Sequence, residues 1–138
     1  MYLDNVKLPS IHYMETISDI CKTAPEYNMT ETSTSPLLVL TNMPDQAGAE
    51  KIAHKLVESK LAACVNILAP CTSVYRWKGK IETATEVPLL IKTTSASYAA
   101  LEDAIRALHP YELPEIVQVP ISGGLPAYIE WLITETKT

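Results

Sequence analysis

Residues 61–94 decide the fold, and their sequence is LAACVNILAPCTSVYRWKGKIETATEVPLLIKTT. Two runs of mainly β-branched, aliphatic and aromatic residues flank the segment WKGK, in which Gly79 can supply the positive φ of a tight turn. This arrangement predicts a β-hairpin with two long arms. Pro70 and Pro88 cannot donate a hydrogen bond to a neighbouring strand, so we expect an irregular or edge position at each of them.

The predicted hairpin is too long for a single small domain. An arm of about 15 residues extends roughly 50 Å at about 3.3 Å per residue. A domain of about 100 residues has a radius of gyration near 13 Å. The tip must therefore project, and the edges of a projecting strand favour pairing with another chain. The hairpin alone predicts an oligomer.

The segments on either side of the hairpin predict further strands and helices. Residues 36–42, PLLVLTN, are typical of a buried strand, and residues 43–60 follow as an amphipathic helix. Residues 95–109 predict a second helix, with Ser95 as its N-cap. The predicted buried faces are Ala49, Ile52, Ala53, Leu56 and Val57 in the first helix, and Tyr98, Leu101, Ile105 and Leu108 in the second.

The end of the chain completes a recognisable order of elements. Residues 115–121 predict a fourth strand, and residues 125–136 predict a terminal helix with Pro126 near its first turn. The order β-α-β-β-α-β with an extra C-terminal helix predicts an α+β fold of the ferredoxin-like type. In this fold an antiparallel sheet of four strands carries two helices on one face.

The N-terminal part of the chain has a different composition. Residues 24–36, APEYNMTETSTSP, are polar and rich in Thr, Ser and Pro, as is typical of linkers. We therefore expect residues 1–35 to be an extension or linker and residues 36–138 to form the domain. Met29 stands shortly before the first predicted strand and is an alternative start, so we expect residues 1–28 to add nothing to the core.

Composition and charge limit the partners and the compartment. The formal net charge is −5 and no run of Lys or Arg occurs, which argues against binding to nucleic acid. No apolar run approaches the roughly 20 residues that span a bilayer, and the N-terminus lacks the pattern of a secretory signal. The three cysteines, Cys21, Cys64 and Cys71, form no C-x-x-C motif, which indicates a reducing compartment. These features predict a cytoplasmic protein without a membrane partner.

Five motifs occur in a characteristic order along the domain. They are LAACVN at residues 61–66, Y-x-W-x-G-x-I-E at 75–82, IKT at 91–93, HPYE-x-PE at 109–115 and Y-x-x-W at 128–131. From about residue 38 to residue 134 the chain closely resembles the CutA divalent-cation-tolerance family. The resemblance implies an intertwined homotrimer whose long hairpins pair between subunits. It also implies a link to tolerance of copper and other divalent cations, and an architecture similar to PII-type signalling trimers.

His109 is the candidate metal ligand. Its imidazole suits Cu(II) or another divalent cation, but one histidine is too few for a complete site, unless a trimer adds ligands across an interface. The alternative is that His109 caps the second helix, because Pro110 ends that helix. Some members of the resembled family carry a Cys and two consecutive His as proposed copper ligands. This chain has Thr41, Leu108 and His109 at those positions.

The other cysteines and histidines give weaker metal candidates. Cys64 lies in an apolar run and is expected to pack as a small hydrophobic residue. Cys71 follows Pro70, where irregular backbone can expose its thiol to metal or oxidation. His54 falls on the polar side of the first predicted helix, so we expect it to be solvated.

A second set of residues predicts a pocket for a small ligand near the subunit interfaces. The set combines polar and aromatic side chains, which are typical of such pockets. In a purely structural alternative the aromatic residues pack, and Lys92 forms an interface ion pair with Glu86 or Glu115. We expect His109 to face the cleft with Lys92, Tyr111 and Glu115 within a few ångströms. The full set is Tyr75, Trp77, Glu86, Lys92, His109, Tyr111, Glu115, Tyr128 and Trp131.

Catalytic motifs are missing from the sequence. It contains no G-x-S-x-G, no H-E-x-x-H and no phosphate-binding glycine loop. An acylphosphatase-like enzyme would need an arginine in an early loop, and the only arginines are Arg76 and Arg106. These absences argue against an enzyme, and the resemblance implies a non-enzymatic, homotrimeric divalent-cation (copper) tolerance protein. The alternative is a PII-like signalling or scaffold trimer that binds a small ligand or a protein at the clefts between subunits.

Overall fold

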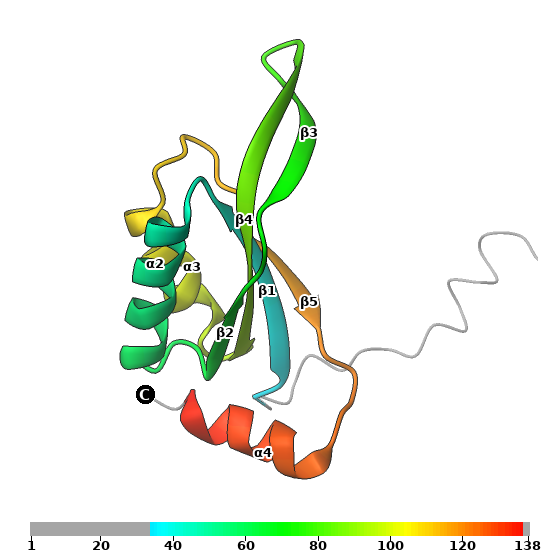
Figure 1. The fold of residues 1–138 in the computed structure, drawn as a ribbon. Helices are drawn as coiled ribbons and strands as arrows, with labels where there is room; N and C mark the ends of the chain where they lie inside the picture. The colour runs from blue at the N-terminus through cyan, green and yellow to red at the C-terminus, as the bar shows by residue number, and fades with distance from the viewer. Residues whose placement is uncertain (1–33, 137–138) are drawn as a thin grey trace, which may run out of the picture. The chain divides into compact units, whose positions relative to one another are not determined.

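The computed structural model describes residues 34–136, and Figure 1 shows their course. Apart from its last two residues, the predicted N-terminal extension lies outside the described part of the chain. The elements are β1 (Pro36–Met43), α2 (Gln46–Glu58), β2 (Cys64–Ile67), β3 (Cys71–Trp77), β4 (Lys80–Thr94), α3 (Tyr98–Leu108), β5 (Val117–Pro120) and α4 (Pro126–Glu135).

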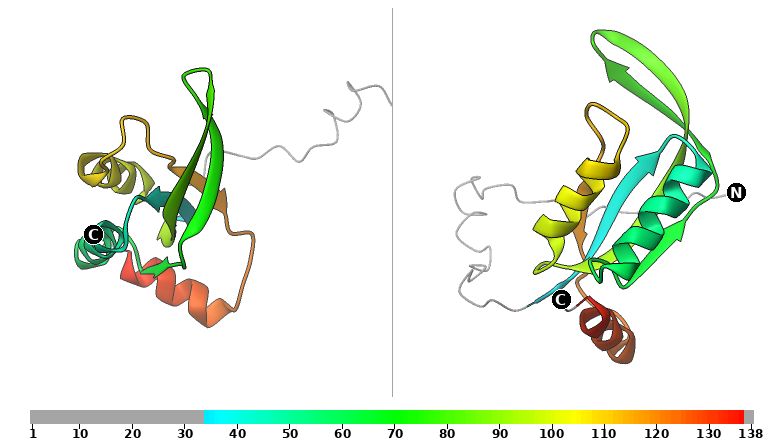
Figure 2. Two further views of the ribbon diagram at one scale, coloured as in Figure 1. Left: turned by 45° about the horizontal axis from the view of Figure 1, so that its top comes forward. Right: turned by 90° about the vertical axis from the view of Figure 1, so that its left-hand side faces the viewer.

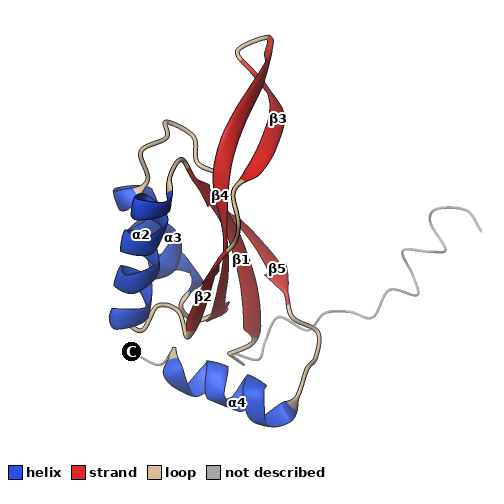
Figure 3. Cartoon of the chain, in the orientation of Figure 1, coloured by secondary structure: helices blue, strands red, loops and turns tan. Residues whose placement is uncertain are grey.

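One antiparallel arrangement of strands forms the centre of the fold. The strands pair in the order β2-β4-β1-β5, and β3 pairs with the outer part of β4. Helices α2 and α3 cover one face of the sheet, and α4 lies across the end at which β1 begins (Figure 3). The predicted α+β fold with an antiparallel sheet and three helices is confirmed.

The core lies between the sheet and the pair α2 and α3. Alternate residues of β1 are buried, as expected for a strand with one covered face. The predicted helix faces are mostly confirmed by the buried residues Ala49, Ile52, Ala53 and Leu56 of α2 and Leu101 and Ile105 of α3. The prediction that Val57 and Leu108 are buried is wrong, since both are exposed. Val57 is one helical step away from the buried stripe, and Leu108 ends α3 where the chain turns away.

The predicted cap of the second helix is also wrong. Helix α3 begins at Tyr98, its N-cap is Ser97, and no side chain caps it. The Ser95 hydroxyl accepts a hydrogen bond from the backbone N–H of Ser35 at 3.0 Å. The Ser97 hydroxyl donates to the carbonyl of Thr136 at 3.0 Å. Both serines therefore connect distant segments of the chain instead of stabilising the start of α3.

The long hairpin is present, and its first arm is divided. β2 and β3 are separated by residues 68–70, and the N–H of Leu68 donates to the carbonyl of Pro88 at 2.9 Å. β4 continues through both pairings as one strand of 15 residues. Lys78 and Gly79 have φ angles of 48° and 80°, which is typical of a type I′ turn. The tip projects beyond the helices (Figure 2).

Candidate functional site

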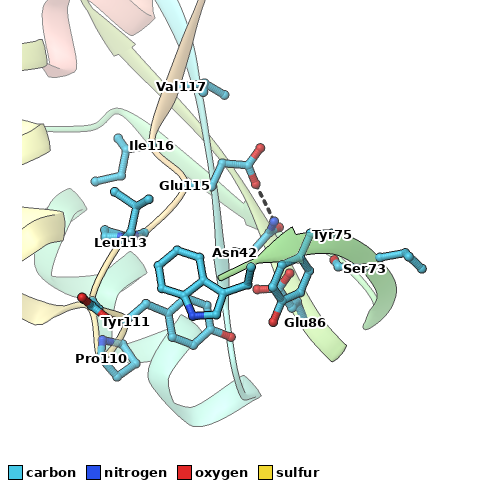
Figure 4. Close-up of a pocket in the computed structure, with 14 residues that line it drawn as sticks. Asn42, Ser73, Tyr75, Glu86, Pro110, Tyr111, Leu113, Glu115, Ile116 and Val117 are labelled. Atoms are coloured by element: carbon cyan, nitrogen blue, oxygen red, sulfur yellow. Dashed lines mark hydrogen bonds between the residues drawn. The ribbon is translucent and has the colours of Figure 1, made fainter. Parts of the chain in front are cut away.

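A pocket of about 910 Å³ lies between the hairpin and the loop that joins α3 to β5 (Figure 4). We call it the hairpin pocket. β1 contributes one lining residue, β3 and β4 contribute five, and the loop into β5 contributes the rest. The lining residues are Asn42, Ser73, Val74, Tyr75, Trp77, Glu86, and residues 110–117.

His109 holds the loop of the hairpin pocket against β1. The backbone of His109 is extended, with φ −80° and ψ 132°, because Pro110 disfavours the helical conformation before it. The ring Nε2 lies 2.7 Å from the carbonyl oxygen of Asn42, and the N–H of Tyr111 donates to Nδ1 at 3.2 Å. Nδ1 is therefore the acceptor, and Nε2 carries the proton and donates to Asn42.

This hydrogen bonding bears directly on the predicted metal role of His109. Both ring nitrogens have partners, and the side chain is buried, with an exposed fraction of 8%. A metal could bind this imidazole only after one of the two hydrogen bonds was broken. Within residues 34–136 no three His, Cys, Asp or Glu side chains are placed to hold an ion together. The metal role of His109 therefore stays a prediction.

Glu86 and Tyr111 form the polar centre of the hairpin pocket. The exposed fraction of Glu86 is 8%, and its carboxylate lies close enough to the Tyr111 hydroxyl to affect its pKa. Burial and, after it, the negative charge of Glu86 raise the pKa of Tyr111 to about 12. The ring of Tyr111 also lies 4.8 Å from the ring of His109, between centroids. The phenol therefore stays protonated at ordinary pH.

Asn42 connects two parts of the site, and no sequence motif indicates its role. Its side-chain amide donates to Glu115 at 2.6 Å, and its backbone carbonyl accepts from His109. The residue is the last but one of β1 and looks like any polar residue at the end of a strand. Only the packing of the loop against β1 reveals these two contacts.

The structure divides the predicted pocket set into two groups. Five of the nine residues line the hairpin pocket, and His109 lies buried next to them. The remaining three, which are Lys92, Tyr128 and Trp131, lie elsewhere. The five lining residues are Tyr75, Trp77, Glu86, Tyr111 and Glu115.

We call the second group, with its neighbours Cys64 and Asn66, the Lys92 cluster. The ammonium of Lys92 lies 2.9 Å from Oδ1 of Asn66, 4.0 Å from Sγ of Cys64 and 5.7 Å from the ring centroid of Tyr128. The rings of Tyr128 and Trp131 are 5.4 Å apart. Cys64 is only partly buried, so its expected role as a buried packing residue holds in part.

Within one chain Lys92 does not lie near His109, so the expected meeting of the two at a cleft between subunits stays a prediction. Lys92 pairs with Leu38 across the ladder, whereas His109 contacts the backbone of Asn42. Asn42 lies four positions after Leu38 on β1, so the two sites are roughly 13 Å apart along this strand. Among residues 34–136 of one chain Lys92 forms no ion pair with Glu86 or Glu115, so the predicted interface ion pair stays a prediction. In residues 34–136 the structure contains a single ion pair, between Lys78 and Glu112.

The two remaining metal candidates are isolated. Cys71 is partly buried, and its sulfur lies 3.7 Å from the Ser73 hydroxyl. His54 is exposed on α2, as predicted. Thr41 is buried in the core, and its hydroxyl has no hydrogen-bond partner among the described residues.

Comparison with known proteins establishes the family. A family model described as "CutA1 divalent ion tolerance protein" matches residues 37–135. This chain belongs to the CutA1 family. The resemblance predicted from the five motifs is therefore confirmed. The family description names no reaction.

Two CutA1 relatives and one solved structure show the extent of the similarity. A Xenopus laevis protein, "Protein CutA homolog", is 49% identical over 89 residues, which are 64% of this chain and 59% of that protein. The Thermus thermophilus "Divalent-cation tolerance protein CutA" is 46% identical over 99 residues, or 72% of this chain and 96% of that protein. A solved Thermus thermophilus structure superposes with a TM-score of 0.73 at 44% identity, covering 74% of this chain and 99% of that one.

Proposed function

We propose that this CutA1-family chain works in divalent-cation tolerance as a non-enzymatic homotrimer that binds a ligand in the hairpin pocket. The observation that supports ligand binding best is the pocket itself, which has a volume of about 910 Å³ and combines aromatic walls with the buried carboxylate of Glu86. Apolar walls with a few well-placed polar groups are the usual form of a small-molecule site. A PII-like signalling or scaffold trimer would use the same pocket.

A copper centre within one chain has less support. Both nitrogens of His109 are engaged, and residues 34–136 hold no cluster of three potential ligands. Borderline metals such as Cu(II) need several nitrogen or sulfur ligands for tight binding. We therefore expect Cu(II) or another divalent cation to bind weakly to one chain. Tight binding would need ligands from more than one subunit.

The exposed strands support the homotrimer. All four residues of the edge strand β5 are exposed, and so are Val74 and Ile81 near the tip of the hairpin, at 66% and 62%. Unpaired edges and exposed apolar side chains favour pairing with further copies of the chain. Analytical ultracentrifugation should give a trimer at micromolar concentration. A monomer would contradict the proposal.

We propose the cytoplasm as the location. In residues 34–136 no helix is long and apolar enough to cross a membrane. Relatives are not all in one compartment, since an Archaeoglobus fulgidus relative is called periplasmic and an Arabidopsis thaliana relative chloroplastic. Fractionation of cells that express the full chain tests the location. Recovery from a membrane or a secreted fraction would contradict it.

Native mass spectrometry tests the ligand proposal most directly. The full chain should be purified without a tag and without added metal. We expect the mass of three chains with a retained small molecule. Calorimetry with Cu(II) on the wild type and on His109→Ala should then give similar, weak affinities. If the wild type binds copper stoichiometrically and His109→Ala lowers the copper affinity by about tenfold or more, a copper centre would be favoured instead.

A further inference from the structure

Among residues 34–136, Glu86 is a buried carboxylate that forms no ion pair. Its exposed fraction is 8%, and the neutral hydroxyl of Tyr111 is near enough for the charge of Glu86 to raise its pKa. The one ion pair within residues 34–136 involves Lys78 and Glu112. A buried charge that has no opposite charge nearby is unfavourable. The site therefore favours any positive group that can reach Glu86.

The rest of the hairpin pocket has the same preference. Two further carboxylates, Glu112 and Glu115, are among its lining residues, and no Lys or Arg is. The aromatic lining residues are Tyr75, Trp77 and Tyr111, as Figure 4 shows for the two tyrosines. Negative charge combined with the faces of aromatic rings attracts organic cations, because the rings carry partial negative charge on their faces.

The chain already places one ammonium group against this lining. The Nζ of Lys78 lies 3.6 Å from a carboxylate oxygen of Glu112 and 5.5 Å from the ring centroid of Trp77. Both partners line the pocket, while Lys78 itself does not. Lys78 and Glu112 are both largely exposed, so this contact is weak. It nevertheless places a primary ammonium beside two residues that line the pocket, Glu112 and Trp77.

We propose that the hairpin pocket binds a small organic cation, in which an ammonium or guanidinium group is attached to an apolar body. The positive group pairs with Glu86, and the apolar body packs against Tyr75, Trp77 and Tyr111. This inference rests on the proposed function, in which the hairpin pocket is the ligand site, and it adds the chemical class of the ligand. Hard divalent cations require six or more oxygen ligands, which an aromatic lining does not provide.

Three probes of the same shape but different charge test the class. They are 2-phenylethylammonium, neutral 2-phenylethanol and anionic 3-phenylpropionate, each titrated into the full chain and followed by NMR shift changes. We expect the ammonium to bind at least tenfold more tightly than the alcohol, and the carboxylate not to bind. Equal affinities for the ammonium and the alcohol would overturn the proposed cation specificity.

Matched variants assign the binding to Glu86. Glu86→Gln removes the charge and keeps the shape, so it should weaken binding of the ammonium about tenfold while leaving the alcohol unchanged. Glu82→Gln is the control, because Glu82 lies on the same strand, is exposed and does not line the pocket. Trp77→Leu provides a second variant, at a partly exposed position, and should weaken the ammonium more than the alcohol. Equal effects of Glu86→Gln and Glu82→Gln would overturn the proposal.

A variant that should raise the affinity for the ammonium probe, instead of lowering it, makes the test stricter. Lys78→Asn removes the internal ammonium and keeps the positive φ, which asparagine tolerates before glycine in a type I′ turn. The probe cation no longer competes with Lys78, so its affinity should rise about twofold. A lower affinity in this variant would contradict the idea that Lys78 occupies part of the cation site.

The cation could also be a side chain of a second copy, such as Lys92, and sedimentation separates this source from a free molecule. If Glu86 pairs with another subunit, Glu86→Gln should dissociate the oligomer, and that result would overturn the small-ligand proposal. Failure of all three probes to bind an intact trimer would refute the ligand pocket of the proposed function itself. Binding of the alcohol without charge preference would refute only the class of ligand.

Discussion

The hairpin pocket and the Lys92 cluster lie on the same strand, β4, and differ in the charge that they leave without an opposite partner. In the hairpin pocket the buried carboxylate of Glu86 meets a phenol. In the Lys92 cluster an ammonium meets an amide, a thiol and the face of a tyrosine. The two charges are six residues apart on β4, or roughly 20 Å. Within residues 34–136 neither charge has an opposite partner.

The largest expected effect comes from removing the side chain that fixes the pocket loop. His109→Ala loses the hydrogen bonds to the Asn42 carbonyl and from the Tyr111 N–H, and it leaves a buried carbonyl without its donor. We expect the free energy of unfolding to fall by about 2 to 3 kcal/mol, measured by urea denaturation. His54→Ala on the exposed side of α2 is the control and should change little. A neutral His109→Ala would show that the loop is not held by this histidine.

The two amides of the two sites give a direct comparison. Asn42→Ala breaks a 2.6 Å hydrogen bond to the carboxylate of Glu115 and should cost about 1 kcal/mol. Asn66→Ala breaks a 2.9 Å hydrogen bond from Lys92 at an exposed position and should cost less, about 0.5 kcal/mol. Thermal unfolding of both variants checks the order. Equal costs would mean that the hairpin pocket is no better organised than the Lys92 cluster.

High pH should act on the hairpin pocket through Tyr111. Its pKa is raised from 10.0 to about 12 in the folded protein, so folding favours the protonated phenol. This contribution to stability is complete below pH 10 and is lost as the pH rises from about 10 to about 12. Tyr111→Phe should remove that part of the pH dependence, as measured by denaturation at pH 9 and pH 11. An unchanged slope would contradict the contact with Glu86.

The smallest effect is expected at the Lys92 cluster. Lys92→Met keeps the aliphatic stem and removes an ammonium whose nearest partners are neutral. We expect a change within about 0.5 kcal/mol in the free energy of unfolding of the oligomer, because partly exposed contacts of this kind contribute little. A large loss, particularly with dissociation of the oligomer, would show that Lys92 meets a carboxylate of another copy.

Local signals in the sequence predicted most of the fold. The period of the apolar residues gave the helices and strands, and Pro70 and Gly79 marked the break and the turn of the hairpin. The prediction of Ser95 as the N-cap failed because the turn before α3 holds two serines that could cap the helix, and tertiary contacts decided between Ser95 and Ser97.

The site was less accessible from the sequence, for a physical reason. Motifs identified the right residue types, but the register of β1 with β4 decides which of them meet, and this register places Lys92 opposite Leu38 and Pro88 opposite Asn42. Asn42 carries no motif, although it makes contacts with both His109 and Glu115. A list of motif residues therefore combined two separate sites into one.

The continuity of β4 has a mechanical consequence. Residues 68–70 separate β2 from β3, so among the strands of residues 34–136 only β4 runs unbroken from the sheet into the projecting hairpin. The outer hairpin is therefore joined to the sheet by β4 alone. Any force on its tip bends the hairpin mainly where β3 begins to pair with β4, at Cys71 and Glu86. A ligand bound between the hairpin and the loop beside Glu86 would restrict bending at this position.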